Sequence, residues 1–353
     1  MLDKKIIVAL FGHKKNQVMN FDFSQIKSIL IRPIGHALGD ACAHSAYAAQ
    51  IKAVYPNCKV GVLAIERNKA IYQLSPAIDE ILEDNILSYL INRKKWQIFL
   101  DCYETFTSKL IIGNALLHSN ITMIFKKHDK KYYSMQNVKN YDYCAHLTED
   151  CHILDRLQQT KLAEAKPLPP AYFQLSFPQE LEEISSLWNN GKVRILLAPQ
   201  GSYEKRLIPA IELAQLLNSV NKKNIINCQF ILSRTQNSLN YYEQLKALCD
   251  EDIDLTLSPQ TNLNEYLALV ASTNIAICID SGTVHLACAF NIPLLAFFAN
   301  LPSNLALWYP RPNQDVPHLT VIADTEITKD TYNFPLNNAI IWLNEQIQIQ
   351  MGK

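Results

Sequence analysis

Short apolar runs alternate along the chain with longer segments in which apolar residues recur at helical spacing. This alternation is typical of βαβ units, in which parallel strands are joined by crossover helices. In the first part of the chain the pattern predicts a helix at about 41–53 and strands at 29–31, 59–64, 98–101 and 121–125. It therefore favours an α/β fold with a mainly parallel sheet.

A proline-rich stretch at 166–178 interrupts this alternation. Proline disfavours helix interiors, so the stretch is expected to be a linker. Beyond it the pattern restarts, with strands predicted at 193–198, 228–232, 253–257, 275–279 and 294–298, and helices at 208–220, 239–249, 263–272, 283–290 and 336–350. The sequence thus predicts two doubly wound, Rossmann-like halves.

The length of 353 residues also suits two domains. We expect an N-terminal extension at 1–27 (with a further strand at 6–10), domains at 28–175 and 176–330, and a C-terminal helix within 331–353. Ligands of doubly wound sheets bind where strands end and loops turn into helices. The active site is therefore expected in a central cleft that both domains face.

Composition narrows the class of protein. The 33 basic and 33 acidic side chains balance, so no general affinity for nucleic acid is expected. The nine cysteines contain no CxxC pair and read as reduced thiols. The start of the chain has too short an apolar core for a signal peptide, and no apolar run is long enough to span a membrane. A cytoplasmic protein is expected.

The most informative segment follows the strand predicted at 275–279. Asp280, Ser281 and Gly282 end that strand and open a helix of small residues, with His285 about one turn further on. Amide groups at a helix start bind phosphate, and Gly282 allows a ligand close to the backbone. Asp280 can accept hydrogen bonds from sugar hydroxyls. The plainer alternative is a helix cap followed by a core histidine.

Two further loops join a predicted strand to a predicted helix. In the first, Gly201 and Ser202 offer an amide and a hydroxyl to phosphate, and Lys205 offers a charge for a diphosphate. In the second, Asp40 follows a glycine-containing loop, and His36 lies within that loop. Asp40 is expected either to cap its helix or to act as a general base, with His36 as its rival for that second role.

Taken in order, these segments resemble the ADP-heptose:lipopolysaccharide heptosyltransferases, glycosyltransferase family 9 with the GT-B fold. The resemblance spans roughly 28–325 and depends on these motifs: Gly39-Asp40, Tyr55-Pro56, Pro76-x-Ile78-Asp79, Gly201-Ser202 with Lys205, and Asp280-Ser281-Gly282-x-x-His285-Leu286-Ala287-x-Ala289 with Pro293. The family commonly has Trp-Pro after the lysine. Here Leu207, Ile208 and Pro209 make that stretch one residue longer.

The resemblance implies an inverting, metal-independent transfer of heptose from ADP-heptose to an inner-core acceptor of lipopolysaccharide or lipooligosaccharide, with no cofactor. Asp40 is then the catalytic base. In the donor-binding C-terminal domain, Ser202 and Lys205 would hold the diphosphate beside Gly201. Ser281 and Gly282 would contact phosphate, and Asp280 and His285 would meet the donor sugar.

A basic run at 126–131 bears on the acceptor-binding N-terminal domain. The run contains four lysines, Lys126, Lys127, Lys130 and Lys131. They would suit a phosphorylated, lipid-linked saccharide as acceptor. They would also favour peripheral contact with the cytoplasmic face of the inner membrane. An ordinary solvated loop is the alternative. Two other functions stay open, namely a related glycosyltransferase that uses another nucleotide sugar and a non-catalytic protein that binds nucleotide sugars.

Overall fold

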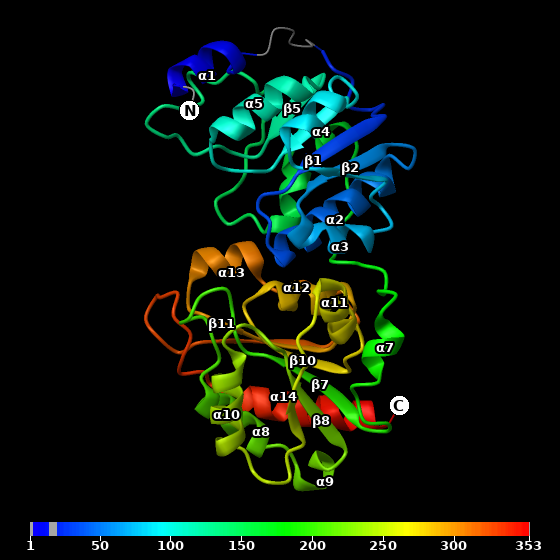
Figure 1. The fold of residues 1–353 in the computed structure, drawn as a ribbon, viewed down its shortest axis with the longest axis vertical. Helices are drawn as coiled ribbons and strands as arrows, with labels where there is room; N and C mark the ends of the chain where they lie inside the picture. The colour runs from blue at the N-terminus through cyan, green and yellow to red at the C-terminus, as the bar shows by residue number, and fades with distance from the viewer. Residues whose placement is uncertain (1–2, 14–19, 353) are drawn as a thin grey trace. The chain divides into compact units, whose positions relative to one another are not determined.

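A computed structural model describes residues 3–13 and 20–352, drawn as a ribbon in Figure 1. The chain divides into two compact units, Met1–Ala171 and Tyr172–Lys353. Within the described residues, no helix is long and apolar enough to cross a membrane. The finer division into segments 1–27, 28–175, 176–330 and 331–353 stays a prediction.

Unit 1 is built on a parallel sheet of six strands in the order β3-β2-β1-β4-β5-β6. Its strands are β1 (Ser28–Arg32), β2 (Lys59–Ala64), β3 (Glu80–Glu83), β4 (Ile98–Asp101), β5 (Ile121–Ile124) and β6 (Tyr143–Cys144). Its helices are α1 (Lys4–Phe11), α2 (Leu38–Val54), α3 (Glu66–Gln73), α4 (Ile86–Ile91), α5 (Ser108–Leu117), the 3₁₀ helix η1 (Ile153–Gln159) and α6 (Lys161–Ala165).

Unit 2 has a second six-stranded parallel sheet, in the order β12-β11-β10-β7-β8-β9. Its strands are β7 (Val193–Ala198), β8 (Cys228–Leu232), β9 (Leu255–Leu257), β10 (Ile275–Ile279), β11 (Leu294–Phe298) and β12 (His318–Ile322). Its helices are α7 (Leu181–Ser185), α8 (Ala210–Asn218), α9 (Lys222–Ile225), α10 (Ser238–Leu248), α11 (Leu263–Ala271), α12 (Gly282–Ala289), α13 (Pro302–Trp308) and α14 (Asn337–Met351).

Both sheets share one topology, which confirms the predicted α/β, doubly wound fold. Residues of the central strands β1, β4 and β10 are all buried, as expected of parallel strands covered by helices on both faces. In each unit the chain order reverses between two adjacent strands, β1 and β4 in unit 1 and β7 and β10 in unit 2. Such reversals are where doubly wound folds bind ligands.

The predicted strand at 6–10 is wrong, because these residues lie in helix α1. The Asp3 carboxylate caps the helix by accepting a hydrogen bond from the Lys5 amide. Ile7 is 3% exposed and packs in the same apolar cluster as Phe106 and Ile111. The helix therefore belongs to the packed core of unit 1 and lies against α5.

Candidate active site

The loop that follows β1 places Asp40 in the first turn of α2. One carboxylate oxygen, Oδ2, accepts a hydrogen bond from the Ala37 amide at 3.0 Å and so caps the helix. Burial raises the pKa of the Asp40 carboxyl, against the lowering effects of the Ala37 amide, His36 and Arg67. Asp40 is consequently a stronger base than a surface aspartate.

His36 lies in the same loop and is half-buried. Its ring Nδ1 is buried and meets no hydrogen-bond partner among the described residues. Of the two candidate bases, His36 thus lies in the loop before α2, and Asp40 lies in the first turn of that helix.

His44, which the sequence did not single out, braces this loop from one turn further along α2. Its Nε2 accepts a hydrogen bond from the Ile34 amide at 3.2 Å, and its Nδ1 bonds the carbonyl oxygen of Asp40. These partners require a neutral ring that carries its proton on Nδ1. Burial lowers the pKa of His44 to about 4, which keeps the ring neutral at physiological pH. His44 therefore holds the two ends of the loop together.

Gly35 leaves room for the Asp40 carboxylate. A Cβ at Gly35 would lie 2.3 Å from Asp40 Oδ2, far inside van der Waals contact. We expect Gly35→Ala to displace the carboxylate and lower kcat by about tenfold to a hundredfold, since catalysis is sensitive to shifts near 1 Å. The matched control is Ala37→Gly in the same loop, which keeps the amide that bonds Asp40. Steady-state kinetics measure the loss of kcat, and thermal melting shows whether the variant is still folded. An unchanged kcat in a folded Gly35→Ala variant would contradict the expectation.

A buried charge cluster lies where β1 and β4 end. Arg32 and Asp101 are paired in register and are 1% and 0% exposed. Asp101 Oδ2 lies 3.3 Å from Arg32 Nη1 and 2.9 Å from Lys127 Nζ. The Asn114 amide joins them, accepting from Arg32 at 2.6 Å and donating to Asp101 at 3.2 Å. One carboxylate therefore compensates two buried cations.

Lys127 was predicted to be one of the acceptor-binding lysines, and the structure corrects this prediction. Its side chain is 0% exposed and engaged with Asp101, so it cannot reach a ligand in solvent. Lys126 is 45% exposed, 3.5 Å from Glu104, and Lys130 and Lys131 are exposed. Three of the four predicted lysines thus remain available at the surface.

In unit 2, Asp280 follows β10, and Ser281 is the N-cap residue of α12. The Ser281 hydroxyl is buried without a hydrogen-bond partner among the described residues. Asp280 Oδ2 accepts from the Asn304 side chain at 2.9 Å and lies 3.5 Å from Arg206 Nη1. Burial raises the pKa of Asp280, although Arg206 and Asn304 favour its ionised form. The strand end therefore combines a carboxylate, a cation and an unengaged hydroxyl beside a helix start.

The loop after β7 folds back on itself, since the Gly201 amide donates to the Arg206 carbonyl at 2.7 Å. Gly201, Ser202 and Arg206 line one small cavity of about 130 Å³ in this loop. Lys205 does not line it; the side chain is 74% exposed and pairs with Asp330 at 3.3 Å. The cation that pairs with Asp280 is Arg206, which the sequence analysis did not select.

His285 is buried within unit 2 and only 3% exposed. Its ring centroid lies 4.8 Å from that of Phe173 and 5.4 Å from that of Trp308. The structure thus places His285 among aromatic rings rather than at an open surface, as the plainer alternative for this residue anticipated.

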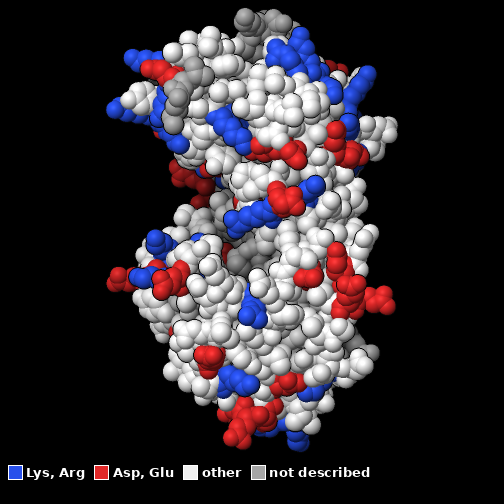
Figure 2. Space-filling model, viewed as in Figure 1, with Lys and Arg blue, Asp and Glu red and all other residues white. Residues whose placement is uncertain are grey.

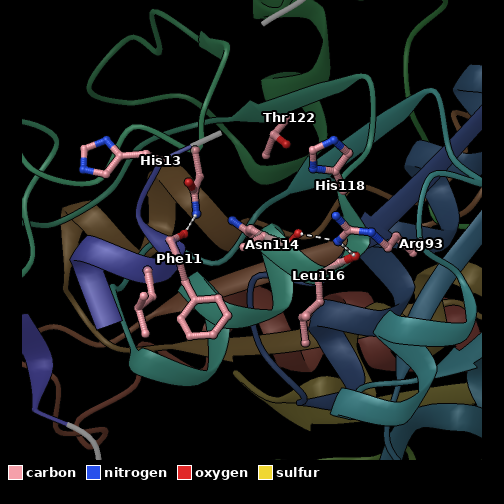
Figure 3. Close-up of a pocket in the computed structure, with 10 residues that line it drawn as sticks. Phe11, His13, Arg93, Asn114, Leu116, His118 and Thr122 are labelled. Carbon is pink, nitrogen blue, oxygen red and sulfur yellow. Dashed lines mark hydrogen bonds between the residues drawn. The ribbon is translucent and has the colours of Figure 1, made fainter. Parts of the chain in front are cut away.

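Another cavity, of about 220 Å³, lies at the C-terminal end of α5 in unit 1 (Figure 3). There Arg93 donates to the carbonyls of Ala115 and Leu116, and Asn140 donates to that of Phe11. No residue of the Asp40 loop lines this cavity. Across residues 3–13 and 20–352, no three His, Cys, Asp or Glu side chains are grouped to hold a metal ion.

Solved structures share the architecture of this chain. The chain superposes on Escherichia coli ADP-heptose lipopolysaccharide heptosyltransferase II with a TM-score of 0.71 and 16% identity, covering 92% of this chain and 99% of that one. For Escherichia coli heptosyltransferase WaaC with ADP, the TM-score is 0.62 at 13% identity, with 92% and 99% covered. The fold is that of a GT-B glycosyltransferase.

Sequence comparison gives the family. The model of "Glycosyltransferase family 9 (heptosyltransferase)" matches residues 120–315. The chain is also 23% identical over 348 residues to "Putative lipopolysaccharide heptosyltransferase 4" of Escherichia coli (strain K12), covering 94% of this chain and 91% of that protein. The chain belongs to glycosyltransferase family 9, as its motifs indicated, and is a glycosyltransferase.

Proposed function

We propose that the protein transfers heptose from ADP-heptose to an inner-core acceptor of lipopolysaccharide or lipooligosaccharide, with inversion and without a metal ion. The observation that carries this proposal is the group at the end of β10, where Ser281, with its unengaged hydroxyl, follows Asp280, and Asp280 pairs with Arg206. A helix start with a cation suits a diphosphate, and a carboxylate suits sugar hydroxyls. The related structures named for ADP-heptose and for ADP favour this donor.

On the donor side, Ser281 and Gly282 would bind phosphate oxygens through the hydroxyl and the amides at the start of α12. Gly201 and Ser202 would add further contacts to the diphosphate. Asp280 would bind hydroxyls of the donor sugar, and His285 would support the sugar site from within the aromatic packing. Arg206, with Lys205 further out, would stabilise the negative charge that develops on the departing ADP.

On the acceptor side, Asp40 would remove the proton from the attacking hydroxyl. That oxygen would bond to the anomeric carbon as the bond to ADP breaks, so a single displacement inverts the configuration. The raised pKa of Asp40 brings its basicity closer to the operating pH. His36, in the same loop, is the second candidate for this base.

The exposed lysines Lys126, Lys130 and Lys131 would attract the phosphates of a lipid-linked acceptor. The same charges would bring the enzyme to the anionic cytoplasmic face of the inner membrane, each contributing about 1 kcal/mol. We accordingly propose a cytoplasmic protein with peripheral membrane contact.

Calorimetric titration with ADP, ADP-heptose, UDP and GDP, each with and without EDTA, tests the donor. Selective binding of ADP and ADP-heptose that EDTA does not change, together with release of ADP when an inner-core acceptor is added, would support the proposal. Preference for UDP or GDP would indicate a family relative with another donor. Binding without any transfer would leave a protein that only holds nucleotide sugars.

Two adjacent cations give a matched test of the donor site. Arg206→Ala should weaken ADP binding by about tenfold or more, because the proposed charged hydrogen bond from the Arg206 guanidinium to the diphosphate is lost. Lys205→Ala should change it by less than about threefold, since this side chain is 74% exposed. Titration of ADP into both variants measures the difference, and a larger loss for Lys205→Ala would reverse the assignment.

A further inference from the structure

A pocket of about 520 Å³ in unit 1 joins the N-terminal helix to the basic run at 130–131. Side chains from three separate segments line it: Lys4, Phe106, Thr107, Ser108, Lys130, Lys131, Tyr132 and Tyr133. The pocket therefore lies at the N-terminal end of α5, with α1 as one wall. Figure 2 shows a group of Lys and Arg side chains around the end of unit 1 where Figure 1 places α1.

Cations converge on this pocket without matching acids. Lys4 Nζ lies 5.0 Å and Lys131 Nζ 5.4 Å from the centroid of the same ring, Tyr132. Among the described residues, none of the three pocket lysines pairs with a carboxylate. The acids next to them in sequence are engaged elsewhere, Asp3 with the Lys5 amide and Asp129 with the Met135 amide. Like charges gathered in this way are stabilised by a bound anion.

The rest of the lining suits a sugar ring. Tyr132 is 40% exposed, and its ring lies close to the ammonium groups of Lys4 and Lys131. Ser108 and Tyr133 add hydroxyls, which bond each other at 2.7 Å. Aromatic faces pack against apolar faces of ligands while hydroxyls fix their orientation. An aromatic wall with an ammonium rim matches a phosphate carried on a saccharide.

We infer that this pocket binds a phosphorylated sugar of the acceptor and that Lys4 of α1 is one of its ligands. The identity of the acceptor rests on the proposed function. The class of ligand, a phosphorylated sugar, rests on the lining of the pocket alone. It assigns α1, which lies outside the family resemblance, a part in acceptor recognition.

Binding of glucose 6-phosphate to the full chain tests the inference, with saturating ADP present to occupy the donor site. Calorimetry should detect binding that weakens with salt, as expected for exposed charges, and no binding of glucose. Lys4→Ala and Lys131→Ala should each weaken it at least about fivefold. Lys5→Ala is the matched control, because Lys5 is an exposed lysine of the same helix that does not line the pocket.

Thermal melting identifies any variant that fails to fold, and Lys131→Ala tests the pocket without changing α1. Equal affinity in wild type, Lys4→Ala and Lys131→Ala would overturn the inference, as would absence of binding. Binding of phosphatidylglycerol vesicles that depends on Lys4 and Lys131, without any binding of glucose 6-phosphate, would overturn the saccharide assignment in favour of a lipid headgroup. ADP binding measured separately reports on the donor site, so failure of either proposal is seen by itself.

Discussion

Replacing Asp40 with asparagine is expected to lower kcat for sugar transfer by about 10²–10⁴-fold, the usual contribution of a general base. The amide keeps an oxygen at the position of Oδ2, so it still accepts the hydrogen bond from the Ala37 amide. Helix capping therefore survives while proton acceptance is lost. ADP affinity should stay within about twofold, because this change lies in unit 1 and the proposed donor ligands lie in unit 2.

The stability of the Asp40→Asn variant tests independently whether burial raises the pKa of Asp40. The folded pKa of Asp40 is raised above its unfolded value, so its contribution to stability is present below the unfolded pKa and lost as pH rises through the folded pKa. At neutral pH the ionised carboxylate is thus a cost to the fold. Asp40→Asn should melt at or above the wild-type temperature, and lower melting would show that the burial argument is wrong.

His36→Ala is the comparison that decides between the two candidate bases. If Asp40 is the base, His36→Ala should retain most of kcat, whereas Asp40→Asn should not. The acid limb of the rate profile should also lie above the pH expected for an ordinary aspartate, in line with the raised pKa. Full activity in Asp40→Asn together with loss in His36→Ala would transfer the role to His36.

Replacing Asp101 with alanine is expected to destabilise unit 1 by about 3–5 kcal/mol, the usual cost of removing one partner of a buried ion pair. The change would leave Arg32 and Lys127, whose side chains are 1% and 0% exposed, without their shared carboxylate. For a unit of this size the melting temperature should fall by about 6–20 °C. Calorimetric scanning or urea unfolding measures the effect.

Lys126→Ala is the matched control for that variant. Lys126 adjoins Lys127 in sequence but is 45% exposed, at 3.5 Å from Glu104, and surface pairs of this kind contribute less than about 1 kcal/mol. We therefore expect Asp101→Ala to lower the melting temperature much more than Lys126→Ala does. Equal melting of both variants would contradict the structural role of Asp101.

The central strands were predictable because burial on both faces leaves long apolar runs. Predicted and observed bounds coincide for β7, β8, β10 and β11. The edge strands β3 and β12 were missed, since they are half-exposed and their mixed sequences, EILE and HLTVI, lack that signal. For α1, the apolar run at 6–10 fits a strand as well as a helix, and only the capping aspartate Asp3 favoured a helix.

The places of two candidate residues in the fold were predictable from their positions in the chain. Asp40 and Asp280 stand at strand–helix junctions, which parallel topology places at sheet ends. Side-chain direction was not predictable. Lys127 belongs to a run of charges but points into the core, and Arg206 rather than its neighbour Lys205 approaches Asp280.

The strand order that the two sheets share also determines how long a strand waits for its partner while the chain is being synthesised. In unit 2, Ile195 of β7 pairs with Ile275 of β10, so one edge of β7 stays open until 80 further residues have been made. At ribosomal rates of about 5–20 residues per second, that interval lasts roughly 4–16 s. The two strands that extend the sheet from that edge of β7, with sequences IAICI and LLAFF, carry no charge. Such strands aggregate readily before they pair, so we expect the yield of folded protein to depend on how fast the chain is translated.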